Sequence, residues 1–449
     1  MLLKEDIKML TDTIVAVSTA LQEQAISIIR LSGSEAFDIA NKMFNKDLKS
    51  KQSHTITYGM ILDQDGNDVD EVLVSIFKSP KSYTSEDVVE INCHGGVFIT
   101  KTILGLCISH GARIARPGEF TERAFINGRI DLTQAEAVNE IIVARNKTDA
   151  KKAIKSMKGS VSRLINPLID DLLQIIAHIE VNIDYPEYED VEMLSENTVL
   201  PLAKRWVNQI QEIIDKAQNS MTIKDGVDTV ILGKPNVGKS SLLNALIEED
   251  KAIVTDIAGT TRDLIEGKIR LNNITLNLID TAGIRETSDK VEQIGIAKSL
   301  EALKKSQLAI VVLDASKQLD EEDEKLLDLT KDMDRIIVYN KDDLKQTNNL
   351  SISALNNDVE ALINAIESKY EKQIIASHDD TLNNERQIGL AIQSKMYMEN
   401  TIKMLEEHTE LDLVTIDLQN SYNSLKEIIG ENSREDLIDA LFSRFCLGK

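Results

Sequence analysis

The sequence has little of what marks extracellular or membrane proteins. It contains only three cysteines, Cys93, Cys107 and Cys446, which are widely spaced and include no Cys-x-x-Cys pair that would suggest a zinc site or a disulfide framework. No apolar run is long enough to span a bilayer, and the first residues lack the pattern of a signal peptide. We therefore expect a cytoplasmic protein with reduced thiols.

An excess of positive charge is also missing. The 449 residues carry a formal net charge of −23, which argues against broad affinity for nucleic acid. One basic stretch departs from this trend: it could bind RNA locally or form the solvated face of a helix, and the sequence alone favours the second. Its residues are Arg145, Lys147, Lys151, Lys152, Lys155, Lys158 and Arg163.

Proline is unevenly distributed, since all six prolines lie at or before Pro235. Residues 1–120 alternate short apolar runs with turns, which indicates an N-terminal α+β domain. Residues 121–222 and 376–449 have apolar side chains at helical spacing and predict one central all-α domain. Residues 223–375 between them predict an inserted P-loop domain of the Ras-like α/β type. The fold class expected is thus multidomain α/β.

Four short motifs follow one another in the order typical of guanine-nucleotide-binding proteins: Gly233–Ser240, Asp280–Gly283, Asn340–Asp343 and Ser353–Leu355. The first has the spacing of a loop whose backbone N–H groups surround phosphates while its lysine neutralises their charge. In the third, Asp343 can accept from the N1 and N2 donors of guanine and would repel the N1 acceptor of adenine. The motifs predict GTP binding.

The polar segment 255–263 lies between the first two motifs and is predicted to be a switch. Thr261 is the candidate for a second Mg²⁺ hydroxyl besides Ser240, and Asp280 could hold a Mg²⁺ water. Ile284 stands where many small GTPases place a water-orienting glutamine, so the counter-charge for hydrolysis must come from an arginine, a metal ion or a partner subunit. The residues predicted to bind GTP are Asn236, Val237, Gly238, Lys239, Ser240, Ser241, Thr255, Asp256, Ile257, Ala258, Gly259, Thr260, Thr261, Asp280, Thr281, Ala282, Gly283, Asn340, Lys341, Asp343, Ser353 and Ala354.

Longer segments resemble the MnmE (TrmE) family of tRNA modification GTPases, which is grouped with the TrmE-Era-EngA-like GTPases. The resemblance is carried by the phosphate loop with segment 255–263, the run 280–296, the stretch Arg116–Ala137 and the ending Cys446–Lys449. It spans essentially the whole chain. It implies a GTP hydrolase, acting on an acid anhydride, that helps to form a carboxymethylaminomethyl or aminomethyl group at C5 of the wobble uridine of certain tRNAs.

The resemblance implies that a potassium ion beside the phosphates supplies the missing counter-charge, and that two GTPase domains meet across a homodimer when GTP is bound. Two residues are candidates for catalysis: Lys239, which neutralises phosphate charge, and Glu292, which matches the water-orienting glutamate of the family. The potassium ligands implied are Asn236, Thr255, Ile257 and Thr260.

The resemblance further implies that the N-terminal domain binds a folate, 5,10-methylenetetrahydrofolate or 5-formyltetrahydrofolate, as one-carbon donor. The matching residues are Arg30, Glu90, Arg129 and the terminal Lys449. The arginines offer cations to the glutamate tail or ring carbonyls, and Glu90 can accept from the pterin donor edge. Segment 18–24 departs from the family, since it lacks the glycine- and proline-rich turn.

By the same resemblance, the chain forms a homodimer through its N-terminal domains and works on tRNA with an FAD-dependent partner, MnmG (GidA), in a heterotetramer or larger assembly. Cys446 lies in the C-terminal signature and could pack or act as a nucleophile. The main alternative is a regulatory or ribosome-assembly switch GTPase without covalent tRNA chemistry. Such proteins often carry an RNA-binding Gly-x-x-Gly loop, and the C-terminal segment has no glycines at that spacing.

Overall fold

The protein is described by a computed structural model covering residues 12–144, 147–184, 198–248, 265–271, 274–279, 303, 305–345, 348–376, 380–432, 435–443, 445 and 448. The chain forms two compact units, residues 1–189 with 407–449 and residues 190–406. The predicted switch 255–263, Asp280–Gly283, Glu292, Cys446 and Lys449 lie outside the described residues.

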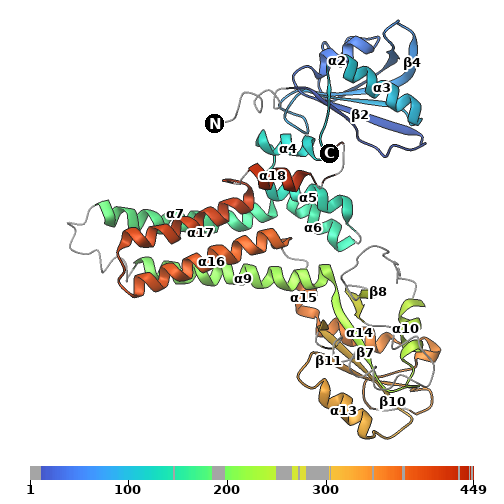
Figure 1. Cartoon of the computed structure of the whole chain (residues 1–449), viewed down its shortest axis with the longest axis vertical. Coiled ribbons are helices and arrows are strands. Elements are labelled where there is room, and N and C mark those ends of the chain that lie inside the picture. Colours follow the sequence, from blue (N-terminus) through green and yellow to red (C-terminus); the bar gives the residue numbers. More distant parts are fainter. Residues whose placement is uncertain are drawn as a thin grey trace. The chain divides into compact units, whose positions relative to one another are not determined.

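The first unit contains a six-stranded sheet in the order β3-β4-β5-β2-β1-β6 (Figure 1). Neighbouring strands are antiparallel except for β1 and β6, which run parallel. The predicted α+β pattern of the N-terminal region is therefore confirmed. The elements are β1 (Ile14–Val17), β2 (Ile26–Ser32), α2 (Ala36–Met43), β3 (Thr55–Leu62), β4 (Asp68–Phe77), β5 (Val88–His94), α3 (Val97–Ser109) and β6 (Arg113–Ile114).

Alternation along the strands decides which face of this sheet is buried. On β4, Val72, Val74 and Ile76 are buried while Leu73 is exposed, because successive side chains of a strand point to opposite faces. The buried side chains join the apolar faces of α2 and α3 in one core. Both helices therefore cover one face. On the other face Leu73 is exposed, whereas Ile14 and Ala16 of β1 are buried against Phe120.

The first unit continues with helices, among which α7 and α17 lie side by side although they are far apart in sequence (Figure 1). On α7, Ile165, Leu172 and Ile179 are buried at helical spacing. The α18 side chain of Phe442 packs with Leu132 of α5 in a separate apolar cluster. The helices are α4 (Glu119–Ile126), α5 (Leu132–Val143), α6 (Lys147–Met157), α7 (Ser160–Asp184), α17 (Leu411–Ile429) and α18 (Glu435–Phe442).

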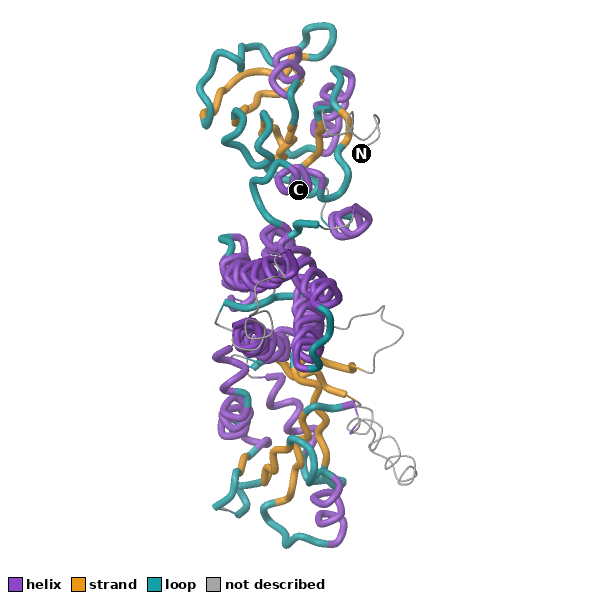
Figure 2. The backbone as a smooth tube through the Cα atoms, turned by 90° about the vertical axis from the view of Figure 1, so that its left-hand side faces the viewer, coloured by secondary structure: helices purple, strands orange, loops and turns teal. Residues whose placement is uncertain are grey.

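The second unit holds the other sheet, with the order β12-β11-β10-β7-β9-β8, and Figure 2 shows the strands of the molecule in two separate groups. All its pairs are parallel except β8 with β9, as the sequence predicts for a Ras-like α/β domain. The elements are β7 (Val227–Leu232), α10 (Lys239–Glu248), β8 (Ile265–Arg270), β9 (Thr275–Ile279), β10 (Leu308–Asp314), α13 (Glu321–Leu329), β11 (Arg335–Asn340), β12 (Ser351–Ile352), the 3₁₀ turn η2 (Ala354–Asn356), α14 (Glu360–Lys369) and α15 (Glu371–Ala376).

This sheet is inserted between two helices that pack against each other, α9 (Leu200–Asp225) and α16 (Glu385–Glu406). Only Gly226 separates α9 from β7. The insertion expected from the sequence is thus present, whereas the exact three-domain boundaries stay a prediction. Within the described residues, no helix combines the length and apolar character that crossing a bilayer requires.

Candidate functional site

The phosphate loop connects β7 to α10, as the motif predicts. It lies at the carboxyl end of a parallel strand, where open α/β sheets bind their ligands. Gly238 has a φ of +95°, and a Cβ there would lie 2.2 Å from Asn340 Nδ2. Only glycine allows the loop to approach the third motif this closely.

Asn340 joins three of the four predicted motifs. It is 3% exposed at the end of β11. Its Nδ2 donates to Val237 O at 2.9 Å and its Oδ1 accepts from Ala354 N at 3.0 Å. The side chain thereby fixes the phosphate loop and the Ser353–Leu355 motif to the same point.

Asp343 is exposed, and its orientation is set by Ser353, whose Oγ donates to Asp343 Oδ1 at 2.7 Å. The carboxylate is therefore available to the donors of guanine. Beside it, Lys341 Nζ lies 2.7 Å from Asp314 Oδ2. Burial acts to raise the pKa of Asp314, but hydrogen bonds from Lys341 and Ser316 outweigh it and lower that pKa to about 2.

Lys239 binds two backbone carbonyls of the phosphate loop. Its Nζ donates to Gly233 O at 2.6 Å and to Lys234 O at 2.8 Å. Burial lowers the pKa of Lys239, because removing a cation from water disfavours its charged form. A bound polyphosphate would favour the charged form, so the loop suits an anion. Asn236 and Ser240, implied as potassium and Mg²⁺ ligands, are exposed on the same loop and at the start of α10.

A second group of side chains gathers in the first unit around Arg30. Arg30 Nε lies 2.7 Å from Glu90 Oε1, its cross-strand neighbour between β2 and β5. The Arg30 guanidinium lies 5.7 Å from the ring centroid of Tyr83, and the Arg129 guanidinium 5.0 Å from that same centroid. Three of the four predicted folate residues are thus brought together.

The fourth predicted folate residue, Lys449, is outside the described residues, but Gly448 before it lies at this cluster. Arg30 Nη1 and Ser18 Oγ each donate to Gly448 O at 3.2 Å. Sequence reasoning missed Tyr83 and Phe120, whose ring centroid lies 5.6 Å from the Arg30 guanidinium. Isolated aromatic residues give no sequence signal of such a role.

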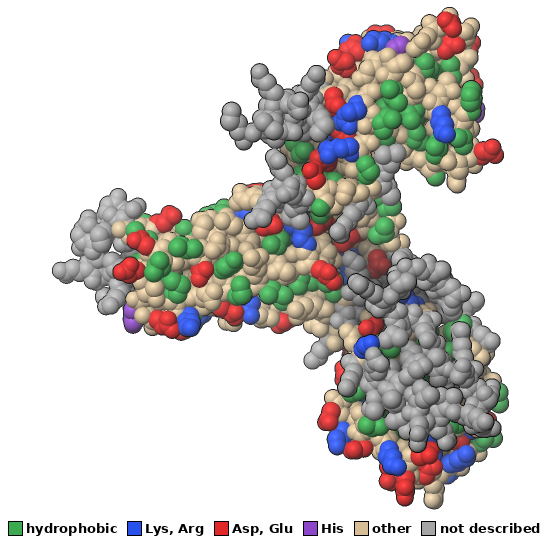
Figure 3. Space-filling view, in the orientation of Figure 1, with side chains coloured by type: hydrophobic (Ala, Val, Ile, Leu, Met, Phe, Trp, Pro, Cys, Tyr) green, Lys and Arg blue, Asp and Glu red, His purple; other side chains and the backbone are tan. Residues whose placement is uncertain are grey.

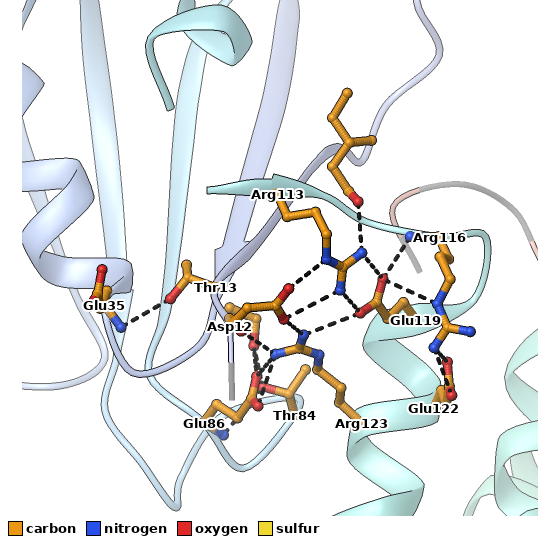
Figure 4. Close-up of polar contacts among 12 residues, drawn as sticks. Asp12, Thr13, Glu35, Thr84, Glu86, Arg113, Arg116, Glu119, Glu122 and Arg123 are labelled. Atoms are coloured by element: carbon orange, nitrogen blue, oxygen red, sulfur yellow. Dashed lines mark hydrogen bonds and ion pairs between the residues drawn. The ribbon is translucent and has the colours of Figure 1, made fainter. Parts of the chain in front are cut away.

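An ion network fixes α4, which carries Phe120, to β6 and to Asp12 just before β1 (Figure 4). Its centre is Arg123, whose side chain is 3% exposed and lies 2.6 Å from Asp12, 3.1 Å from Glu86 and 3.2 Å from Glu119. Burial acts to raise the pKa of Glu119, but Arg113 outweighs it and the net pKa is lowered.

The described part of the basic stretch lies on α6, in the turn after it and at the start of α7, while Arg145 is outside the described residues. Lys151 and Lys155 are exposed on α6, on the side opposite the buried Ala153, and Lys158 is exposed just after the helix ends at Met157. Arg163 is exposed too, and its Nη1 donates to Lys158 O at 2.6 Å. The stretch is thus a solvated helix face, as the sequence alone favours, and its relation to RNA is untested.

Two protein-family profiles match this chain, and together they span most of it. The profile described as "GTP-binding protein TrmE N-terminus" matches residues 13–129, and that of the "MnmE helical domain" matches residues 132–446. This chain belongs to the MnmE family of tRNA modification GTPases. Residues 13–129 are the family's N-terminal domain, which here includes the Arg30 cluster.

Relatives in the MnmE family match nearly the full length. The tRNA modification GTPase MnmE of Levilactobacillus brevis is 46% identical, with 98% of each chain covered. That of Streptococcus pneumoniae is 47% identical, covering 98% of this chain and 99% of its own. The solved structure of Aquifex aeolicus Era bound to GDP·AlF4⁻ is 24% identical over 38% of this chain and 67% of its own, with a TM-score of 0.24.

Proposed function

We propose that this MnmE-family GTPase hydrolyses GTP with Mg²⁺ and K⁺ and uses the resulting movement to drive modification of tRNA at C5 of the wobble uridine. The observation that carries the proposal is Asn340, which holds the phosphate loop and the Ser353–Leu355 motif beside Asp343. This arrangement suits a guanine nucleotide with its phosphates at the start of α10.

The described residues supply binding and orientation. Backbone N–H groups of the loop 233–239 and Lys239 would hold the phosphates, and Asp343 the base. Ser240 and Asn236 would contribute to the Mg²⁺ and K⁺ sites. These cations supply positive charge to the oxygens of the transferring phosphoryl group, the part an arginine finger has in other GTPases. We also propose that Glu292 orients the attacking water. The further cation ligands proposed are Thr255, Ile257 and Thr260 for K⁺ and Thr261 for Mg²⁺.

The Arg30 cluster is proposed to bind the folate that provides one carbon. Arg30 and Arg129 offer two cations at 5.7 Å and 5.0 Å from the Tyr83 ring centroid, and Glu90 adds one acceptor. Aromatic rings flanked by cations suit a flat pterin with a glutamate tail. Glycine or ammonium would provide the rest of the substituent at C5 of the uridine. The FAD-dependent partner MnmG would take part in the modification reaction.

Exposed apolar side chains on β3 and β4 of the N-terminal sheet support the proposed homodimer. Ile56, Tyr58 and Leu73 are 65%, 55% and 47% exposed, and Tyr58 pairs directly with Leu73 across β3 and β4. Neighbouring exposed apolar side chains on one sheet face are typical of protein interfaces. Tyr58→Glu is expected to shift the sedimentation of the chain towards a monomer; an unchanged dimer would place the interface elsewhere.

The potassium mechanism is tested by measuring the rate of GTP hydrolysis in potassium and in sodium. The two salts are compared at equal ionic strength and over a range of protein concentrations. We expect the rate to rise with potassium and with concentration, and to lose this potassium response in Asn236→Ala. Equal rates in both cations would refute the potassium role. A wobble uridine that stays modified in cells lacking the protein would instead support a purely regulatory GTPase.

A further inference from the structure

Lys234, the second residue of the phosphate loop, has no assigned part in nucleotide binding. Its Nζ lies 2.5 Å from Asp320 Oδ2 and 2.7 Å from Asp323 Oδ2, and its side chain is 17% exposed. Lys234 follows Gly233, where the chain leaves β7, while both carboxylates belong to the start of α13. The lysine therefore ties the phosphate loop to another element of the same domain.

The two carboxylates are held in place by α13 itself. Asp320 is the N-cap residue and accepts from Glu322 N at 3.1 Å and Asp323 N at 3.2 Å. Asp323 in turn accepts from Asp320 N at 3.3 Å. This reciprocal capping box fixes both side chains relative to the helix. Neither carboxylate can follow the lysine without uncapping α13.

Asp323 differs from the other acidic residues of the first turn of α13. Glu321, Glu322 and Glu324 are exposed, and acidic side chains are visible over this end of the unit in Figure 3. Asp323 is only 4% exposed, and its Oδ1 has no hydrogen-bond partner among the described residues. Lys234 is thus the cation that compensates this buried charge.

Lys234 also contacts Lys239, the lysine proposed to bind the phosphates. Its backbone carbonyl accepts from Lys239 Nζ at 2.8 Å. The contacts therefore run from the carboxylates on α13 to the Lys234 side chain, and from the Lys234 carbonyl to the Lys239 ammonium. Because two carboxylates already neutralise Lys234, its own attraction for phosphate is weak.

We propose that Lys234 is a positioning residue for GTP, which orders the empty phosphate loop, and with it Lys239, by anchoring the loop to Asp320 and Asp323. The inference rests on the proposed GTP binding. The anchor acts on the loop before the nucleotide arrives, whereas the phosphates themselves hold the loop in the complex. Its loss should therefore raise KM for GTP and the Kd for GDP, with kcat nearly unchanged.

Three variants of the full-length protein separate positioning from direct phosphate binding. Lys234→Met removes the charge at similar length, and Lys234→Arg restores it. The double variant Asp320→Asn, Asp323→Asn keeps oxygen acceptors for the capping box but frees the lysine. Lys331→Met is the matched control, because it breaks an exposed ion pair with Asp328 on the same helix.

The measurements are the Kd of fluorescent GDP and the kcat and KM of GTP hydrolysis. We expect Lys234→Met and the double aspartate variant each to raise Kd and KM about tenfold. Combining them should add nothing, since both remove one anchor. Lys234→Arg should bind within about twofold of the parent, and Lys331→Met should be unchanged. Circular dichroism confirms that each variant is folded.

Two results would overturn the proposal. Unchanged nucleotide binding in Lys234→Met would make the anchor an ordinary ion pair. Tighter or unchanged binding in the double aspartate variant, together with weaker binding in Lys234→Met, would make Lys234 a direct phosphate ligand. Failure of the parent protein to bind GDP at all would instead refute the proposed function, so the two failures are distinguishable.

Discussion

The ion network around Arg123 allows a quantitative test of how α4 is held in place (Figure 4). The perturbation is Arg123→Met, which keeps an unbranched side chain but removes the guanidinium. Arg123 and Glu119 each have side chains only 3% exposed. The change leaves Glu119 buried with Arg113 and, at 3.8 Å, Arg116 as its remaining cations, and it removes one of the two arginines that bind Asp12.

The cost follows from this burial. Removing one partner of a buried ion pair destabilises a protein by about 3 to 5 kcal/mol, because the other charge stays uncompensated. Since Arg113 still pairs with Glu119 and Asp12, we expect the lower end, about 3 kcal/mol. Lys49→Met is the control in the same domain: its ion pair with Asp38 is 54% and 51% exposed. That change should cost less than about 1 kcal/mol.

The assay is hydrogen exchange followed by mass spectrometry on peptides from β1 and α4, at neutral pH. A loss of about 3 kcal/mol corresponds to exchange about a hundredfold faster where exchange requires this region to open. Exchange in α4 that is no faster in Arg123→Met than in Lys49→Met would refute the reasoning. Exchange that becomes faster in α4 but not in β1 would show that the ion network stabilises the helix alone.

The same network predicts the direction of the pH dependence. Arg113 holds the pKa of Glu119 below its ordinary value of 4.5, although burial acts to raise it. A carboxylate with a lowered folded-state pKa stabilises the fold above its unfolded-state pKa, and this contribution is lost as the pH falls through the folded-state value. Acid unfolding of this region should therefore begin at a higher pH in Arg123→Met than in the parent.

Three further predictions address the sites. Asp343→Asn should weaken GDP binding about a hundredfold, since charge-assisted hydrogen bonds to two guanine donors are lost, and should improve binding of xanthosine diphosphate, measured by competition. Arg30→Ala should abolish saturable folate binding in equilibrium dialysis; binding that persists would remove this site assignment. Replacing Lys151, Lys155 and Lys158 by glutamine should weaken tRNA binding and flatten its salt dependence, whereas an unchanged affinity would leave these lysines as a solvated face.

The sequence was sufficient to predict those parts of the nucleotide site that are formed by residues close together in the chain. The spacing 233–240 requires a strand before it and a helix after it, and β7 and α10 are found there. The meeting of Asn340 with Val237 could be anticipated only from the order of the motifs, because parallel strands bring their carboxyl ends to one edge. The anchor from Lys234 to α13 has no such pattern and could not be predicted.

Contacts between distant segments escaped prediction altogether. Arg113 and Arg123 meet Asp12 across 101 and 111 residues, and neither the spacing nor the charge of these residues marks them as partners. Their arrangement depends on β6 pairing with β1, which places the start of α4 beside the start of the sheet. Sequence periodicity identifies such strands but not their neighbours.

The end of the chain makes another contact with distant residues that the sequence does not predict. The Gly448 carbonyl accepts from Arg30 Nη1 and Ser18 Oγ, 418 and 430 residues away in sequence. Gly448 has a φ of +87°, and a Cβ there would lie 2.5 Å from Val17 O, so this approach to β1 requires glycine. Because α17 packs against α7 and α18 against α4, the last residues are held within the same unit as Arg30, and the complete Arg30 cluster requires both ends of the chain.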